Sequence, residues 1–240
     1  MPIVFAQQGY LDSGQHWNIS PGQTINYRIF QGGSPDIPDN SEITAIQAAF
    51  QTWENDAGSY VDFTYGGLTA TRASLQSGRA DGVNVVDFIN MGSDAGFVVA
   101  VYRSPLSGNP LTECDMLFNE FYTFSTNLAP NTFDVQNLAT HEAGHFLRLL
   151  DLYDNDDSEQ TMYGYVAFQE TIRRTLEWGD VAGARYIYPN RYLVGGGSLG
   201  WETQGADVAV GNINGAGLTD LVTLWVDNPS GENSIKYRFG

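Results

Sequence analysis

Two histidines and a glutamate lie close together in the second half of the chain. The stretch HEAGH spans residues 141–145, and Asp151 follows six residues later. Residues four apart share one face of a helix, so the imidazoles of His141 and His145 can bind one metal ion. Glu142 faces the same space from the next position, where it can take a proton from a metal-bound water without using a coordination position. HExxH is the pattern of catalytic zinc sites, so this stretch predicts bound zinc and hydrolytic chemistry.

A helix over about residues 134–147 would position these side chains. Apolar residues recur through this segment at steps of three and four, among them Val135, Leu138, Ala139 and Phe146, as is typical of an amphipathic helix. The alternative is that both histidines are buried structural residues. The motif, the helix and the placing of two of the three histidines of the chain in it favour a metal site.

Length and composition predict a globular protein. The 240 residues, with 42% hydrophobic and 13% aromatic content, suffice for one substantial domain and a small appendage. No apolar run is long enough to span a bilayer, which argues against membrane insertion. The first residues, MPIVFAQQ, lack the pattern of a signal peptide, so we expect the chain of an exported protein to start after its signal.

The charge of the chain excludes some partners. A net charge of −17 repels nucleic acid and anionic membranes, so neither is expected as a main partner. The same acidity is typical of secreted proteins in saline or calcium-containing media, and we expect an extracellular protein. The single cysteine, Cys114, excludes an internal disulfide and cannot build a thiolate site by itself, so a small buried residue is expected there.

The order of predicted elements indicates an α+β domain with helices on one face of a twisted mixed sheet. Two further helices are predicted, at about 41–56 and 175–188. Five alternating or apolar segments between turn-forming clusters predict strands, at residues 22–30, 60–65, 83–89, 96–103 and 113–119.

The run HEAGHFLRLLD and the methionine in QTMYGY resemble the metzincin zinc endopeptidases, closest to bacterial matrixin-like domains, over about residues 10–190. The resemblance implies a metzincin-type zincin with an active-site helix and a Met-turn. It implies that His141, His145 and Asp151 bind zinc and that Glu142 is the general base. Met162 would be the Met-turn residue beneath the metal.

The resemblance also implies protein or peptide substrates that bind in extended form against an edge strand, here 96–103 or 113–119. Tyr163 and Tyr165 are candidates to donate a hydrogen bond to the oxyanion, and aromatic packing is the alternative. The acidic residues at 154–159 make calcium a second candidate ion, with a solvated acidic loop as the alternative.

The segment between His145 and Asp151 departs from the family pattern. On an unbroken helix Asp151 would lie about 600° around the axis from His145, so the helix must end between them. Metzincins turn here at a glycine, where this chain has Arg148. The first hypothesis is a secreted zinc endopeptidase that hydrolyses peptide bonds with zinc-bound water activated by Glu142. The second is an impaired pseudoprotease that acts as a binding module because Arg148 breaks the turn, and a third is zinc hydrolysis of a non-peptide substrate.

The chain divides into three parts on composition. The resemblance implies that residues 1–190 form a metzincin-like zinc peptidase domain. Residues 191–200 shift to glycine and serine, which predicts a Gly/Ser linker. Residues 201–240 resemble a partial VCBS or FG-GAP repeat and predict a small all-β segment. Such a unit buries its apolar faces only against neighbours, so it packs on the peptidase domain or belongs to a longer array. The sequence leaves the oligomeric state open.

Overall fold

The computed structural model describes residues 9–73, 80–103, 110–190, 208–211, 220–226 and 233–238. Contacts divide the chain into two units, Met1–Pro189 and Asn190–Gly240. In the described part of the chain, no helix is both long and apolar enough to cross a membrane.

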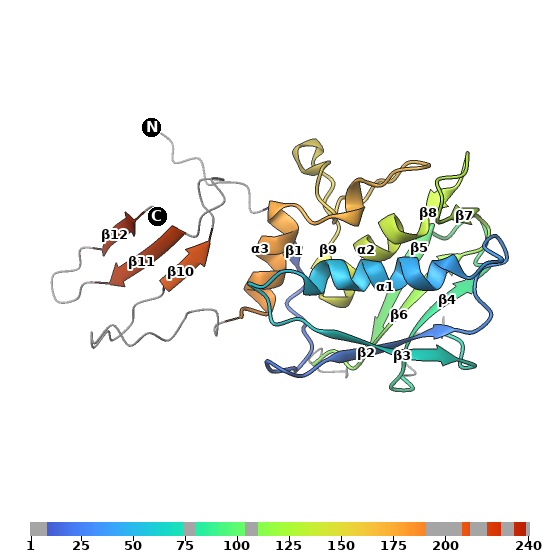
Figure 1. Ribbon diagram of the computed structural model, residues 1–240, viewed down its shortest axis with the longest axis horizontal. Coiled ribbons are helices and arrows are strands. Elements are labelled where there is room, and N and C mark those ends of the chain that lie inside the picture. Colours follow the sequence, from blue (N-terminus) through green and yellow to red (C-terminus); the bar gives the residue numbers. More distant parts are fainter. Residues whose placement is uncertain are drawn as a thin grey trace. The chain divides into compact units, whose positions relative to one another are not determined.

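The first unit is built on a five-stranded mixed sheet with the order β3-β2-β4-β6-β5 (Figure 1). Strands β3, β2, β4 and β6 are parallel, and β5 pairs antiparallel with β6 at one edge. Of the two strands predicted as the substrate edge, 96–103 does lie at an edge. The prediction for 113–119 is wrong, because β6 lies between β4 and β5. The bounds are β2 Ile25–Phe30, β3 Phe63–Thr69, β4 Asn84–Ile89, β5 Val98–Arg103 and β6 Glu113–Asn119.

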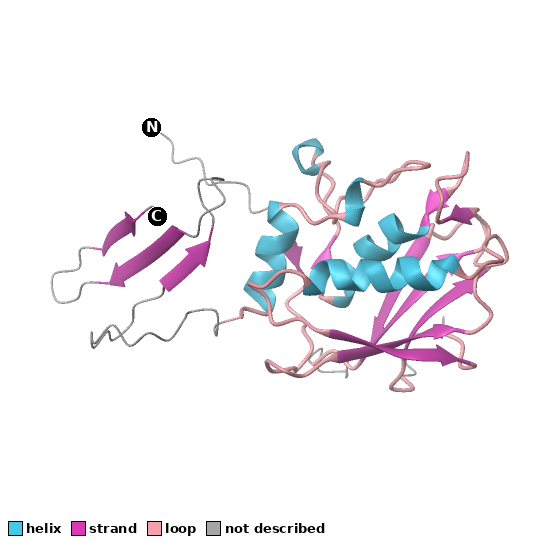
Figure 2. Cartoon of the chain, viewed as in Figure 1, coloured by secondary structure: helices cyan, strands magenta, loops and turns pink. Residues whose placement is uncertain are grey.

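Two helices, α1 (Ser41–Glu54) and α2 (Val135–Phe146), lie on one face of this sheet (Figures 1 and 2). Ile46, Ala49, Phe50 and Trp53 of α1 are buried. The indole Nε1 of Trp53 donates to the Thr140 carbonyl of α2 at 2.8 Å. The rings of Phe50 and Phe146 meet edge to face at 5.2 Å. These contacts fix the motif helix against the core, and they confirm the predicted α+β class with a mixed sheet.

The third helix, α3 (Trp178–Ile187), begins three residues later than predicted. The residues before it form a short 3-10 helix, η2 (Ile172–Arg174), and a capping box between Glu177 and Asp180 then starts α3. Cys114 is fully buried in β6, as predicted.

The described part of the unit also contains two short strand pairs and a second 3-10 helix, η1 (Asn155–Asp157). β1 (Leu11–Asp12) pairs with β9 (Leu149–Leu150), and β7 (Phe124–Ser125) pairs with β8 (Phe133–Asp134). The β1-β9 pair ends one residue before Asp151, so the N-terminal segment supports the approach to that residue.

In the second unit, β10 (Val208–Gly211), β11 (Asp220–Val226) and β12 (Asn233–Arg238) form an antiparallel three-stranded sheet. The predicted linker, 191–200, lies outside the described residues. The assignment of this unit to a VCBS or FG-GAP repeat stays a prediction.

Candidate active site

The side chains of His141, His145 and Asp151 meet at one point beside α2. The Nε2 atom of His141 lies 3.0 Å from Oδ1 of Asp151, and Nε2 of His145 lies 3.5 Å from the same oxygen. One atom from each residue lies within 4.8 Å of the others. Within the described residues, this is the one group of three or more His, Cys, Asp or Glu side chains close enough to hold a metal ion. The structure thus brings together the three residues that the sequence selected.

Each imidazole is oriented by a backbone carbonyl. Nδ1 of His141 lies 2.7 Å from the Thr161 carbonyl oxygen, and Nδ1 of His145 lies 2.7 Å from that of Leu149. A carbonyl can only accept, so both Nδ1 atoms carry a proton, and both Nε2 atoms face the shared space, where each neutral imidazole would present a lone pair to a metal ion. This arrangement orients histidine ligands in metal sites.

Charge also favours an ionised Asp151. Burial raises the pKa of Asp151, but hydrogen bonds from His141 and His145 outweigh it and hold that pKa well below its ordinary value. Burial lowers the pKa of His145, but the hydrogen bond to Asp151 and the charges of Glu142 and Asp151 raise it to about 9. At neutral pH the site therefore presents a carboxylate oxygen, and a metal ion that binds there displaces the proton of His145.

The turn between His145 and Asp151 forms in spite of its arginine. Helix α2 ends at Phe146, and Arg148 adopts a φ of 74°, the left-handed conformation for which glycine is the usual residue. The Arg148 amide donates to the His145 carbonyl at 2.9 Å. The chain then reverses into β9, which carries Asp151 back to the histidines.

The N-terminal segment holds this turn in place. The amide of Ser13 donates to the Arg148 carbonyl at 3.1 Å, and the Arg148 guanidinium donates to Oε1 of Gln15 at 2.7 Å. The indole of Trp17 donates to the Phe146 carbonyl at 2.7 Å. An arginine at positive φ costs about 1–2 kcal/mol, and hydrogen bonds worth about 1 kcal/mol each offset this strain.

Replacement of Arg148 by glycine tests this balance. The variant gains about 1–2 kcal/mol from relief of the strain. It loses the hydrogen bond to Gln15 and the packing of a side chain that is only 3% exposed. We expect the free energy of unfolding in urea to fall by no more than about 2 kcal/mol, with zinc content unchanged. Gln15→Ala is the matched control, because it removes the hydrogen bond alone. Zinc that binds only to Arg148→Gly would show that arginine disables the site.

The methionine turn packs directly beneath the motif helix. Met162 is fully buried, and its carbonyl accepts from the Leu152 amide at 2.8 Å. Buried Asp180 accepts from the amides of Thr161 and Met162 at 2.8 and 3.1 Å. Gly144 makes the close approach possible, because a Cβ there would collide with the Met162 sulfur and lie 2.8 Å from the ring of Trp53.

Gly144→Ala is expected to destabilise the protein by about 1–2 kcal/mol in urea unfolding. Overpacking of a filled core costs about 1–3 kcal/mol, which exceeds the gain of about 1 kcal/mol from the helix propensity of alanine. In a Met162→Ala background the collision with the sulfur is relieved and the close contact with the Trp53 ring remains, so the same substitution should cost less than in the parent chain. A stabilising Gly144→Ala in the parent chain would contradict the packing described here.

Glu142 lines a cleft next to the three converging side chains. The cleft has a volume of about 410 Å³ and is lined by the start of β5, by α2 and by residues from the 164–173 region. Glu142 is 5% exposed, and its Oε2 is buried with no hydrogen-bond partner among the described residues. A buried carboxylate oxygen with an unused lone pair is suited to accept a proton from a water molecule in the cleft.

Sequence reasoning missed one side chain that touches the site. The Tyr153 hydroxyl donates to Oδ2 of Asp151 at 3.2 Å, which orients the carboxylate, and no local pattern marks this tyrosine. Tyr163 and Tyr165 pack together with ring centroids 5.6 Å apart, and neither lines the cleft, which favours the packing alternative.

The acidic segment 154–159 contains the 3-10 helix η1 (Asn155–Asp157), where Asp157 is buried. They do not form a group of converging ligands within the described residues. Calcium at this loop stays a prediction.

Comparison with known proteins agrees with this geometry. Among curated proteins, no relative matches the sequence. The family model of the matrixins matches residues 16–189, a span that includes the three converging side chains, Glu142 and Met162. Matrixins are zinc metalloproteases that act on proteins and peptides. The match covers well over half of the chain, so this protein belongs to the matrixin family.

Proposed function

We propose that this protein is a zinc-dependent endopeptidase in which His141, His145 and Asp151 bind zinc and Glu142 is the general base. The observation that carries the proposal is the convergence of two imidazole Nε2 atoms on one carboxylate oxygen, at 3.0 and 3.5 Å. Nitrogen and oxygen ligands of tetrahedral zinc lie about 2.0–2.2 Å from the ion, hence about 3.3 Å from each other. The residues present therefore match the needs of zinc.

Three protein ligands leave one position for water or substrate, as in catalytic zinc sites. When bound, zinc lowers the pKa of its water ligand to near neutrality and polarises the scissile carbonyl. Glu142 takes the proton of the attacking water on its unpaired carboxylate oxygen and then delivers it to the leaving nitrogen. The carbonyls of Thr161 and Leu149 keep both imidazoles in one tautomer throughout.

The edge of the sheet supports a peptide substrate. Gly96, Phe97 and Val98 line the cleft, and β5 pairs with β6 on one side only. The other edge of β5 offers backbone hydrogen bonds to an extended chain, a common mode of peptide recognition. A strand edge that binds an extended backbone is expected of a peptidase. A zinc hydrolase of small non-peptide substrates does not need one.

The pseudoprotease hypothesis rested on Arg148. The left-handed conformation of Arg148 and the position of Asp151 favour an intact turn, and a buried Glu142 carboxylate in the cleft suits a general base better than a pure binding module. Both observations support the endopeptidase.

Cleavage of an unfolded protein tests the proposal. The chain, stripped of metal and reloaded with one equivalent of zinc, should cleave casein, and the activity should vanish on chelation and return with zinc. A zinc-loaded, folded preparation that leaves casein and a mixed peptide library intact would overturn the proposal.

We further propose that the enzyme acts outside the cell. The net charge of −17 supports this site of action. Activity recovered only from inside intact producing cells would contradict it.

A further inference from the structure

A buried cation lines the cleft opposite the motif helix. Arg173 belongs to η2, is 2% exposed and lines the same cleft as His141 and Glu142. Its Nε atom is buried and has no hydrogen-bond acceptor among the described residues. Burial lowers the pKa of Arg173, as expected for a guanidinium whose charge is poorly compensated.

The nearest carboxylate, that of Glu170, neutralises the charge of Arg173 only in part. Oε1 of Glu170 lies 3.4 Å from Nε of Arg173, an ion pair that lacks hydrogen-bond geometry. The other oxygen of Glu170 accepts from the Ala167 amide at 3.0 Å. Asp151 and Glu142 act on Arg173 from a distance, and bound zinc would offset the charge of those two carboxylates.

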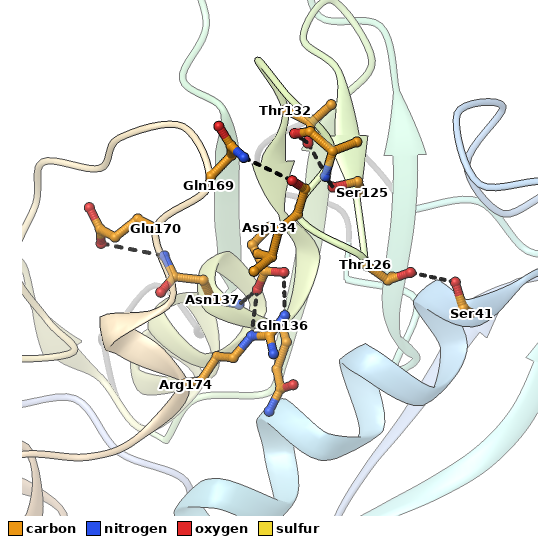
Figure 3. Close-up of polar contacts among 12 residues, drawn as sticks. Ser41, Ser125, Thr126, Thr132, Asp134, Gln136, Asn137, Gln169, Glu170 and Arg174 are labelled. Atoms are coloured by element: carbon orange, nitrogen blue, oxygen red, sulfur yellow. Dashed lines mark hydrogen bonds and ion pairs between the residues drawn. The ribbon is translucent and has the colours of Figure 1, made fainter.

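The position of Arg173 is fixed relative to the motif helix. Figure 3 shows Arg174 paired with Asp134, the N-cap of α2, where its Nε donates at 2.8 Å. The side-chain amide of Asn137, in α2, contacts residues 170–173 through both its oxygen and its nitrogen. Its nitrogen donates to Glu170 at 3.5 Å (Figure 3). Its oxygen accepts from the Arg173 backbone amide at 2.9 Å. The backbone of Arg173 is thus anchored to the helix that carries Glu142.

We propose that Arg173 selects substrates with an acidic side chain, Asp or Glu, at a position next to the scissile bond. This inference rests on the proposed peptidase function. A carboxylate in the cleft would supply the missing acceptor, and carboxylate–guanidinium pairs are the strongest of the side-chain hydrogen bonds. An apolar side chain would leave a buried cation uncompensated, and an uncharged amide would satisfy the donor without neutralising the charge.

Matched peptides test the proposal. Zinc-loaded protein is given peptides that differ only in Glu, Gln or Leu at each position flanking the cleaved bond. We expect kcat/KM for Glu to exceed that for Gln at least tenfold at one position. In Arg173→Met the Glu to Gln ratio should fall to about one and cleavage of the Leu peptide should rise. Arg185→Met, which breaks the exposed pair with Asp56, should keep the ratio. No acidic preference in the parent chain, or an equal loss on all three peptides in Arg173→Met, would overturn the proposal.

If Arg173→Met does not fold, a second variant tests whether Arg173 selects acidic side chains. Glu170→Gln keeps an acceptor for the Ala167 amide and removes the competing charge, so the Glu to Gln ratio should rise severalfold. An unchanged or lower ratio would refute the role of Arg173.

Peptide binding separates this proposal from the peptidase itself. Dissociation constants of the Glu and Gln peptides for the zinc-loaded parent chain and for Glu142→Ala are measured by fluorescence anisotropy. Tenfold tighter binding of Glu peptides without any cleavage would retain the selectivity and reject the peptidase. Cleavage with equal binding of both peptides would reject the selectivity alone.

Discussion

Glu142→Ala is expected to lower kcat/KM for peptide hydrolysis by about a thousandfold and to leave one zinc ion bound. A positioned general base contributes about 10²–10⁴ to the rate, and Glu142 is the buried carboxylate of the cleft that has an unpaired oxygen. It is not among the three side chains that converge, so zinc affinity should not depend on it. The measurement is steady-state cleavage of a quenched fluorescent peptide, with zinc content determined on the same sample.

The matched control is Glu159→Ala, which removes an exposed carboxylate on the nearby acidic loop and should leave kcat/KM within twofold. Two results would contradict the role of Glu142. One is activity of Glu142→Ala within tenfold of the parent chain, and the other is loss of zinc from the variant, which would make the glutamate a ligand.

Asp151→Asn is expected to weaken zinc binding by about a hundredfold or more. Substitutions that only disturb the surroundings of a ligand already cost about 10–100-fold in affinity, and this one removes the charged oxygen on which both Nε2 atoms converge. Asparagine keeps the shape of the side chain, so the Tyr153 hydroxyl retains a partner and the turn should persist. Zinc affinity is measured by competition with a chromophoric chelator.

Asp156→Asn provides the control, since Asp156 is an exposed residue of η1 and its loss of charge should not change the affinity for zinc. If Asp151→Asn bound zinc as tightly as the parent chain, a ligand other than Asp151 would have to complete the site.

The motif helix could be predicted from the sequence because its signal is local. Apolar periodicity gave the segment 134–147, and the helix spans Val135–Phe146. Strand β3 was placed too early, at 60–65 instead of Phe63–Thr69, because Gly66 and Gly67 lower the strand propensity of its second half. Pairing with β2 continues past them through a shift in register. Tertiary pairing here overrides local propensity.

The supports of the site could not be predicted, because each joins residues distant in sequence. Arg148 can occupy a glycine position because residues 11–17, about 130 positions away in the sequence, hold the turn. Tyr153 and Arg173 carry no motif of their own. They reach the site because β9 reverses the chain and because Asp134 and Asn137 anchor the 170–174 segment on α2. Periodicity shows which face of an element is apolar, and it does not show which loop packs over a cleft.

X-ray absorption at the zinc edge tests the central claim most directly. On protein loaded with one equivalent of zinc, we predict two imidazole ligands and one or two further oxygen ligands at about 2.0–2.2 Å. One imidazole ligand should be lost in His145→Ala. A spectrum of the parent chain with fewer than two imidazoles, or a spectrum that does not change in His145→Ala, would show that zinc binds elsewhere and would contradict the assignment of this site.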